Sequence, residues 1–217
     1  MKFVKTSHRY ADILFQLDEN MKFLWEQVEE VLTNITEEEI IREHYAILSR
    51  QEETKSISKA INSIIKTKLE AKGWHSESPI FADEDYDGSD GTWRLDFAKQ
   101  DIAIEVAFNH GGNVSWNLIK PVLSSELNHV KKAIQTKAGI VITATKKMKR
   151  AGGFDGAVGS YEKYVEYLKP LNNLLTTPIL VIGLLPPETF KIIQRTDAHK
   201  RKVGLVQMLE TGEIITE

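Results

Sequence analysis

The chain has 217 residues, of which 41% are hydrophobic and 27% are charged, and its formal net charge is −3. This size and composition fit one soluble globular domain with a substantial core. The absence of cysteine excludes disulfides, thiolate zinc sites and cysteine nucleophiles. No apolar run reaches the length of a membrane span and no signal-peptide core precedes residue 16, so we expect a cytoplasmic protein.

The charged residues are unevenly distributed along the chain. Acidic residues concentrate at 36–39 and 83–90, whereas basic residues cluster at 131–132, 146–150 and 195–202. Segregated charge can create a basic face on a protein that is slightly acidic overall. The alternative is that each run is solvated surface.

The first third of the chain is mainly helical in pattern. Residues 10–17 are interpreted as a short strand or an irregular lead-in. After Asn20, a suitable N-cap, apolar residues recur every three or four positions, which is typical of a helix. A further helix is predicted at 40–50, and a stronger one at 57–72, which Gly73 ends.

The segment 75–92 is predicted to be a loop. Within it, the motif Asp83-x-Asp85-x-Asp87-Gly88 begins like the calcium-binding loop of an EF-hand. The twelfth position of that loop requires a bidentate Glu, but Arg94 stands there, and no helix leads into the segment. The sequence therefore favours a solvated connection over a calcium site.

Residues 93–108 predict two short strands that carry a pair of carboxylates. Apolar residues alternate along the second strand, which directs Glu105 to the opposite face, and Asp96 occupies the equivalent place in the first strand. If the chain reverses at Gln100-Asp101, the two acidic residues face each other with Cβ atoms roughly 5 Å apart. Two carboxylates this close repel unless a cation lies between them, and their hard oxygen ligands suit Mg²⁺. The alternative is a solvated hairpin face, and Gln-Asp is not among the dipeptides that two-residue turns prefer.

The second half of the chain alternates helices with apolar strands, which indicates an α/β fold. We expect one domain over 1–217, with a core at about 20–185 and a central mixed sheet of about five strands flanked by helices. The predicted elements are a helix over 114–122 that is interrupted near Pro121, a helix over 124–136, a buried strand over 139–145, a glycine-rich loop over 151–159, a helix over 160–168, a buried strand over 178–184, and a C-terminal hairpin over 203–217.

Several short motifs, taken in order, resemble those of type II restriction endonucleases of the BglII, BstYI and BamHI group, which have the PD-(D/E)XK nuclease fold. The likeness extends over about residues 20–185. It is carried by LEAKGW at 69–74, the nine-residue spacing of Asp96 and Glu105 followed by Val106 and Phe108, SELNH at 125–129 before the strand at Gly139, SYE at 160–162, and PILVIGL at 178–184.

This resemblance implies Mg²⁺-dependent hydrolysis of phosphodiester bonds in double-stranded DNA, with Asp96 and Glu105 as metal ligands. In the family, the residue two positions after the Glu completes the site as Gln, Glu or Lys, but here it is Ala107. Lys120 or Glu70 could supply the missing group; the alternative is that Lys120 is an exposed lysine at a helix end, and this alternative is stronger for Glu70. Otherwise the protein is a naturally impaired relative, or the alanine was introduced to prevent cleavage.

The resemblance also implies how DNA would be read. Asn109 and His110 follow the active-site strand where the family places base-contacting side chains, and Asn suits a bidentate contact with adenine. The loop 150–160, with Arg150, Asp155 and Ser160, corresponds to another base-reading segment. Asn109 and His110 could instead be a turn residue and an incidental surface histidine. By analogy we expect a homodimer that reads a palindrome, with a GATC-containing hexamer as one target, and a cognate DNA methyltransferase as genetic partner.

Three functions remain open from the sequence. The first is a type II restriction endonuclease, and the second is a sequence-specific DNA-binding relative without chemistry, for which Ala107 is the reason. The third is a repair or recombination nuclease that depends on DNA structure, because one fold can carry all three functions. The sequence contains no phosphate-binding glycine motif, no H-E-x-x-H pair and no G-x-S-x-G nucleophile motif.

Overall fold

A computed structural model describes residues 1–50, 54–83, 92–126, 129–196 and 202–215. Within these residues, six strands form one mixed sheet in the order β1-β6-β5-β4-β3-β2, and three form a second sheet in the order β7-β8-β9. The strands are β1 (Phe3–His8), β2 (His75–Pro79), β3 (Arg94–Lys99), β4 (Ile102–Val106), β5 (Ala138–Ala144), β6 (Ile179–Leu184), β7 (Phe190–Thr196), β8 (Lys202–Met208) and β9 (Ile214–Ile215).

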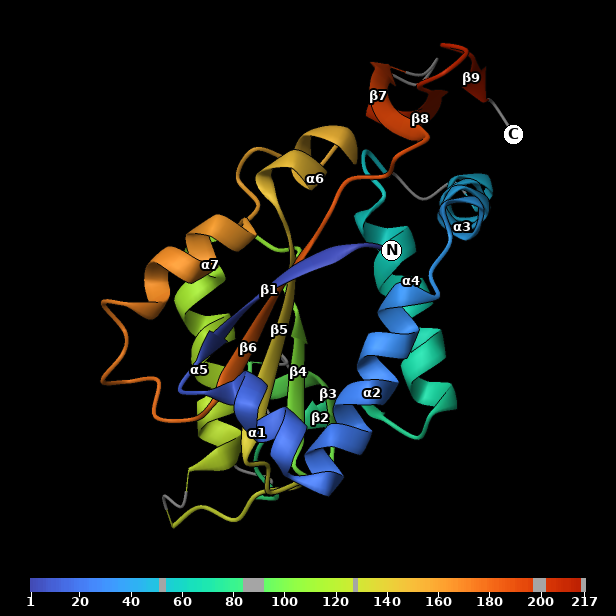
Figure 1. Cartoon of the computed structure of the whole chain (residues 1–217). Helices are drawn as coiled ribbons and strands as arrows, with labels where there is room; N and C mark the ends of the chain where they lie inside the picture. The colour runs from blue at the N-terminus through green and yellow to red at the C-terminus, as the bar shows by residue number, and fades with distance from the viewer. Residues whose placement is uncertain (51–53, 84–91, 127–128, 197–201, 216–217) are drawn as a thin grey trace.

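Helices cover both faces of the six-stranded sheet (Figure 1). Helices α5 and α7 pack on one face, whereas α2 and α4 pack on the other. This arrangement confirms the predicted α/β fold with a mixed sheet between helices. The helices are α1 (Ala11–Leu17), α2 (Glu19–Thr33), α3 (Glu37–Ser49), α4 (Ser58–Ala71), α5 (Val114–Ser125), α6 (Lys146–Ala151) and α7 (Tyr161–Leu168).

The centre of the sheet is parallel and its two edges are antiparallel. Strand β5 pairs in parallel with β4 and β6, and every residue of β5 and β6 is buried. These are the two apolar runs that the sequence predicts as buried strands, since a parallel strand covered by helices on both faces has no polar side. The antiparallel strands β3 and β2 extend the sheet beyond β4, and β1 pairs antiparallel with β6.

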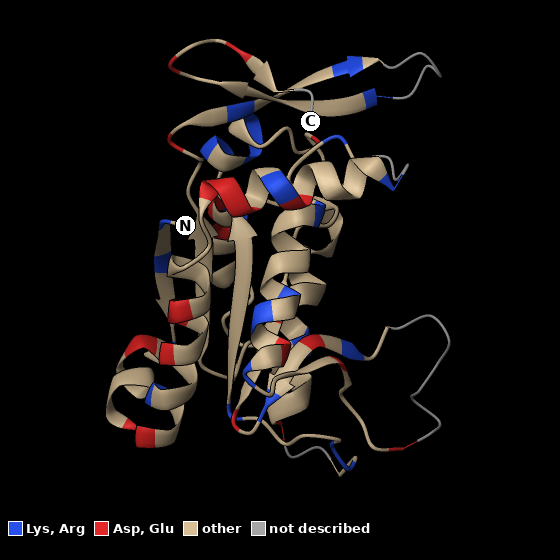
Figure 2. Ribbon diagram, turned by 90° about the vertical axis from the view of Figure 1, so that its right-hand side faces the viewer, with Lys and Arg blue, Asp and Glu red and all other residues tan. Residues whose placement is uncertain are grey.

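The smaller sheet β7-β8-β9 packs with helix α3 at one end of the molecule. The His44 ring shares a 2.8 Å hydrogen bond with the Gly204 carbonyl, and Val206 N donates to the Tyr45 hydroxyl at 3.1 Å. In the ribbon of Figure 2, blue Lys and Arg positions lie on the smaller sheet, and red acidic positions mark the start of α3. The acidic run at 36–39 is therefore placed at a helix N-terminus, where negative charge stabilises the helix.

Several boundaries differ from the predictions. Residues 11–17 form helix α1, not a strand, after two left-handed residues at Arg9 and Tyr10. Helix α2 is capped by Asp18, which accepts a 2.9 Å hydrogen bond from Met21 N, so the predicted cap at Asn20 is wrong by two residues. Residues 75–79 form strand β2, whereas most of the calcium-like motif falls at 84–91, outside the described residues.

The predicted helix over 124–136 is wrong. Helix α5 continues through Pro121 and ends at Ser125, and residues 129–136 are irregular. The Ser124 and Ser125 hydroxyls bond to the Thr136 hydroxyl, and Thr136 N donates to the Ser124 carbonyl. These contacts fold the chain back on the end of α5, because serine side chains compete with the helical backbone for hydrogen bonds. In the described part of the chain, no helix is long and apolar enough to span a membrane.

Candidate active site

Strands β3 and β4 form the hairpin that the sequence predicts. Phe97 pairs with Ile104 and Lys99 with Ile102, so the reversal occurs at Gln100-Asp101. Gln100 adopts a φ of 47°, the left-handed conformation that such a turn requires. Continuing this register by one pair places Asp96 opposite Glu105. The Asp96 carboxylate accepts a hydrogen bond from Val106 N at 2.5 Å, so it reaches across to the neighbouring strand beside Glu105.

The two faces of the hairpin have different surroundings. Phe97, Ile102 and Ile104 belong to the main core under α2 and α4. On the other face, Ala98 and Ala103 pair with each other and belong to an apolar cluster that Leu123 of α5 packs against. Alternation along the strands puts both carboxylates on this second face.

Glu105 is buried and only partly satisfied. Its side chain is 2% exposed, and Lys120 Nζ from α5 lies 2.5 Å from Glu105 Oε2. The other oxygen, Oε1, is buried without a hydrogen-bond partner. Burial raises the pKa of Glu105 to about 8, with a further contribution from the Asp96 charge, despite the opposing effect of Lys120. Burial also raises the pKa of Asp96, and the 2.5 Å bond from Val106 N partly offsets this increase.

These features suit a bound divalent cation. An unpartnered buried carboxylate oxygen is costly, and a cation between Asp96 and Glu105 would both satisfy it and remove the repulsion. Among the residues that the structure describes, no group of three or more His, Cys, Asp or Glu side chains could hold a metal ion. Asp96 and Glu105 are two hard oxygen donors, and a divalent cation held by them would complete its coordination with water.

The side chain of Ala107 has no polar atom and is buried. Its side chain is 1% exposed and lies in an apolar cluster with Leu118 and Tyr164, and its N–H donates to the Ile142 carbonyl at 2.7 Å. Of the two residues considered as replacements, Lys120 contacts Glu105 directly and also donates to the Arg94 carbonyl at 3.0 Å.

The other candidate, Glu70, is exposed on α4, and its carboxylate accepts a hydrogen bond from the Ser76 hydroxyl. The structure instead brings a different acidic residue near the hairpin. Glu77 of β2 lies opposite Asp96 in the register of the strands, has a φ of 48°, and its charge raises the pKa of Asp96. Glu77 is not among the site residues predicted from the sequence, because the polar segment HSESP carries no strand signal and falls in the predicted loop 75–92.

The two segments predicted to read bases lie side by side. Gly159 N donates to the Asn109 carbonyl at 3.1 Å, and Gly111 N donates to the Ala157 carbonyl at 2.6 Å. His110 forms a bridge with Val158 between these two contacts. The side chains of Asn109 and His110 are exposed. The turn after β4 and the loop before α7 therefore form one surface.

The predicted DNA-reading residues of the second segment differ in their exposure to solvent. Arg150 is exposed at the end of α6, and the exposed Asp155 accepts a 2.8 Å hydrogen bond from Ala157 N. Ser160 is only 5% exposed and immediately precedes α7. Burial restricts Ser160 to contacts within the protein or with a group that enters the adjoining cavity.

Two cavities with basic linings adjoin this loop. One, of about 590 Å³, is lined by residues that include His110, Lys146, Lys149 and Lys163. The other, of about 400 Å³, is lined by residues that include Lys55, Lys59, Lys202 and Asp155. The pKa of Lys149 is lowered mainly by burial. Lysines grouped in this way attract the phosphates of a nucleic acid.

Solved structures of known proteins share this fold. The chain matches the crystal structure of restriction endonuclease BglII complexed with a DNA 16-mer, with a TM-score of 0.66 and 22% identity over 100% of both chains. It matches the crystal structure of free BglII with a TM-score of 0.57 and 21% identity, again over 100% of both chains. At this identity, the structural matches establish the fold. No curated protein matched the chain.

The sequence itself matches a family model described as restriction endonuclease BglII/BglIII over residues 3–184. This match includes the carboxylate hairpin, helix α5 and both loops of the predicted DNA-reading surface. Because the model covers most of the 217 residues, the chain belongs to the BglII/BglIII family of restriction endonucleases, which are type II site-specific deoxyribonucleases that use divalent metal ions.

Proposed function

We propose that the protein is a Mg²⁺-dependent type II endonuclease that hydrolyses double-stranded DNA at a short palindromic site. One observation carries this proposal. Asp96 and Glu105 face each other across the β3-β4 hairpin, and a buried oxygen of Glu105 has no partner while Lys120 contacts the other oxygen.

In this proposal, Asp96 and Glu105 hold the metal ion. When bound, the ion supplies Lewis-acid polarisation of the scissile phosphate and lowers the pKa of a water ligand. Lys120 takes the place of the polar residue that is missing at Ala107. Its ammonium group balances the charge of Glu105 and stabilises negative charge that develops on the phosphate. Glu77 adds negative charge beside Asp96, which strengthens the attraction for a cation.

The DNA-binding surface in this proposal is the joined surface of 109–111 and 157–159. In this proposal, the lysines of the two adjoining cavities contact phosphates, and the exposed Asn109, His110 and Asp155 contact base edges. The protein acts as a homodimer, because a palindromic site matches a two-fold axis. A GATC-containing hexamer is the first target to examine, and a cognate methyltransferase would protect host DNA.

Cleavage of unmethylated DNA tests the proposal. Wild-type protein and Glu30→Gln, a control at an exposed carboxylate of α2, should give the same discrete fragments with Mg²⁺. Asp96→Asn and Glu105→Gln should reduce cleavage by a factor of about 1000 or more, since each removes a metal ligand. If wild-type protein gives no discrete fragments from a broad panel of unmethylated DNA, the proposal is wrong.

Ala107 supports a second candidate, a sequence-specific DNA-binding protein without chemistry. This function predicts tight binding to one short palindrome and no cleavage when Mg²⁺ is added. A repair nuclease on the same fold would instead respond to DNA structure, so branched or nicked duplexes would be cut irrespective of sequence. Binding and cleavage measured on the same duplexes separate these functions.

A further inference from the structure

The exposed side chain of Asn109 is hydrogen-bonded to the buried side-chain amide of Asn117. Asn117 of α5 is 1% exposed, and its Nδ2 donates to Asn109 Oδ1 at 2.9 Å and to the Tyr164 hydroxyl at 2.6 Å. In return, Asn109 Nδ2 donates to Asn117 Oδ1 at 3.4 Å. A surface side chain is therefore joined through two hydrogen-bonded residues to the inside of the molecule.

This reciprocal pair determines what Asn109 can offer to DNA. A carboxamide has one edge that presents an N–H and a carbonyl oxygen side by side, and this edge makes bidentate contacts with adenine. In the structure, that edge of Asn109 faces Asn117. The second N–H and the second lone pair of Asn109 point away from that edge, so they can make single hydrogen bonds but not the bidentate contact that the sequence suggests.

The buried Tyr164 hydroxyl accepts a hydrogen bond from Asn117 and so holds the Asn109–Asn117 pair in this orientation. Tyr164 is 0% exposed, and burial raises the pKa of its hydroxyl, which therefore stays neutral. If Asn109 turned away, the Asn117 amide would lose partners in a site that water does not reach. An unsatisfied buried polar group is costly, which favours the paired orientation before DNA arrives.

Helix α5 connects this pair to the carboxylate site. Asn117 and Lys120 are three residues apart, so they are neighbours on the surface of one helix. Asn117 contacts the predicted base-reading residue, and Lys120 contacts Glu105. Helix α5 thus positions one residue beside the predicted base-reading residue and another beside the carboxylate pair.

We propose that Asn117 is a positioning residue that fixes Asn109 to read one base pair of each half-site through a single hydrogen bond. The part of this inference that concerns DNA rests on the proposed function. The part that concerns positioning is a property of the protein alone. The two parts can therefore be tested separately.

Selection of binding sequences from randomised duplexes in Ca²⁺ tests the DNA part. Wild-type protein should enrich one palindrome, and Asn172→Ala, a control at an exposed asparagine, should enrich it equally. Asn117→Ala should lose about tenfold in discrimination at one base pair per half-site, which is the usual cost of one lost base contact, while average duplex affinity changes by less than about threefold. Tyr164→Phe keeps the ring in the core and should give a smaller loss at the same base pair.

Unchanged base preference in both Asn117→Ala and Tyr164→Phe would overturn the inference. A uniform loss of affinity for every sequence would also overturn it, because a merely structural role predicts that result. If Asn117→Ala does not fold, Tyr164→Phe alone decides. A wild-type protein that enriches no sequence would contradict the proposed function itself.

Side-chain amide exchange in DNA-free protein tests the positioning part. The Asn109 NH₂ hydrogens, followed by NMR, should exchange with solvent at least about fivefold faster in Tyr164→Phe than in wild type, because loss of the anchor loosens the pair. The Asn172→Ala control should leave this exchange rate unchanged. Equal exchange rates in wild type and Tyr164→Phe would show that Asn109 is not held in this way.

Discussion

Glu105 is a carboxylate that the fold removes from water before any metal binds. Burial, and then the charge of Asp96, raise its pKa to about 8 from an ordinary value of 4.5. The Lys120 ion pair opposes this shift but does not cancel it. The site therefore stores unfavourable electrostatic energy that a divalent cation would release, which is a common property of functional sites.

This shift predicts that metal-free protein loses stability as pH rises. Because the pKa of Glu105 is higher in the folded state, the folded chain holds more protons between pH 4.5 and about 8. The free energy of unfolding in EDTA should thus fall across this range and level off above it. Urea denaturation from pH 5 to 9 measures the slope, which Glu105→Gln should flatten. Equal slopes in the two proteins would contradict this account.

Mg²⁺ bound at Glu105 should stabilise the folded protein, and this stabilisation should grow with pH. The ion binds the ionised carboxylate, so the stabilisation it gives should increase as pH approaches about 8. Melting temperatures with Mg²⁺ and with EDTA, compared at pH 6 and pH 8, measure this effect. Asp96→Asn should abolish the difference, whereas an effect of Mg²⁺ that persists in this variant would place the ion elsewhere.

Lys120 should be needed for cleavage rather than for DNA binding. Lys120→Met removes the ammonium group next to Glu105, and we expect the rate constant for cleavage to fall about 100-fold while duplex affinity changes little. Single-turnover kinetics separate the two quantities. Lys72→Met, which removes a lysine paired with Glu30 on another face, is the matched control. Full activity of Lys120→Met would exclude the role given to this lysine.

At the scale of elements, a proline inside helix α5 contacts the neighbouring strand β5, although helix interiors normally exclude proline. Pro121 lies inside the helix, where its ring removes a backbone hydrogen bond. That ring packs against Gly139 at the start of β5, where a Cβ atom would lie 2.5 Å from Pro121 Cβ. The close approach of α5 to the sheet is what brings Lys120 to Glu105.

Gly139→Ala should therefore destabilise the protein. The new methyl group would force α5 away from β5, and such overpacking costs about 1–3 kcal/mol of unfolding free energy. Urea denaturation measures the change. Gly156→Ala is the control, because a Cβ there meets nothing within 4 Å, and its stability should stay within about 0.5 kcal/mol of wild type. Similar stability of the two variants would show that the contact is not tight.

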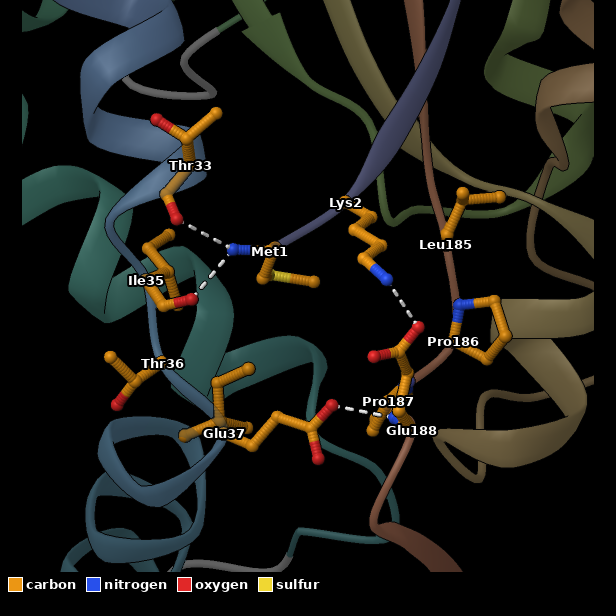
Figure 3. Close-up of a pocket in the computed structure, with 11 residues that line it drawn as sticks. Met1, Lys2, Thr33, Ile35, Thr36, Glu37, Leu185, Pro186, Pro187 and Glu188 are labelled. Carbon is orange, nitrogen blue, oxygen red and sulfur yellow. Dashed lines mark hydrogen bonds and ion pairs between the residues drawn. The ribbon is translucent and has the colours of Figure 1, made fainter.

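At the scale of the whole molecule, several chain segments join the part that contains the six-stranded sheet to the unit formed by α3 and the smaller sheet. Two of these segments follow α2 and β6, and their residues 35–36 and 185–188 line a cavity of about 390 Å³, shown in Figure 3. Glu37 lines the cavity, and its carboxylate accepts hydrogen bonds from Glu188 N at 2.5 Å and Thr189 N at 2.9 Å. Lys2 pairs with Glu188 at 2.6 Å.

Glu37→Gln should loosen the smaller sheet without unfolding the larger one. Loss of the carboxylate weakens two backbone contacts, which corresponds to about 1 kcal/mol and a fivefold increase in local opening. Hydrogen exchange should become faster in β7 and β8 and remain unchanged in β5 and β6. Glu210→Gln, at an exposed position of the same unit, serves as control. Equal acceleration in both sheets would indicate global destabilisation instead.

The sequence by itself determined the elements whose residues carry their own signal. The apolar β-branched runs of β5 and β6 must be buried, and the periodic helix α4 has one apolar face. The alternation around Asp96 and Glu105 also fixed which side chains share a face of the hairpin. In each case the pattern is local, because the period of a strand or helix is set by the backbone alone.

Only the tertiary structure decided the elements and contacts that depend on distant partners. The polar segment HSESP becomes β2 because β3 offers it an edge, and α5 continues through Pro121 because Gly139 accepts the ring. The contact between Lys120 and Glu105, and the pairing of Asn109 with Asn117, arise when α5 lies across β4. No local periodicity encodes them, since the free energy that selects them comes from packing between segments remote in the chain.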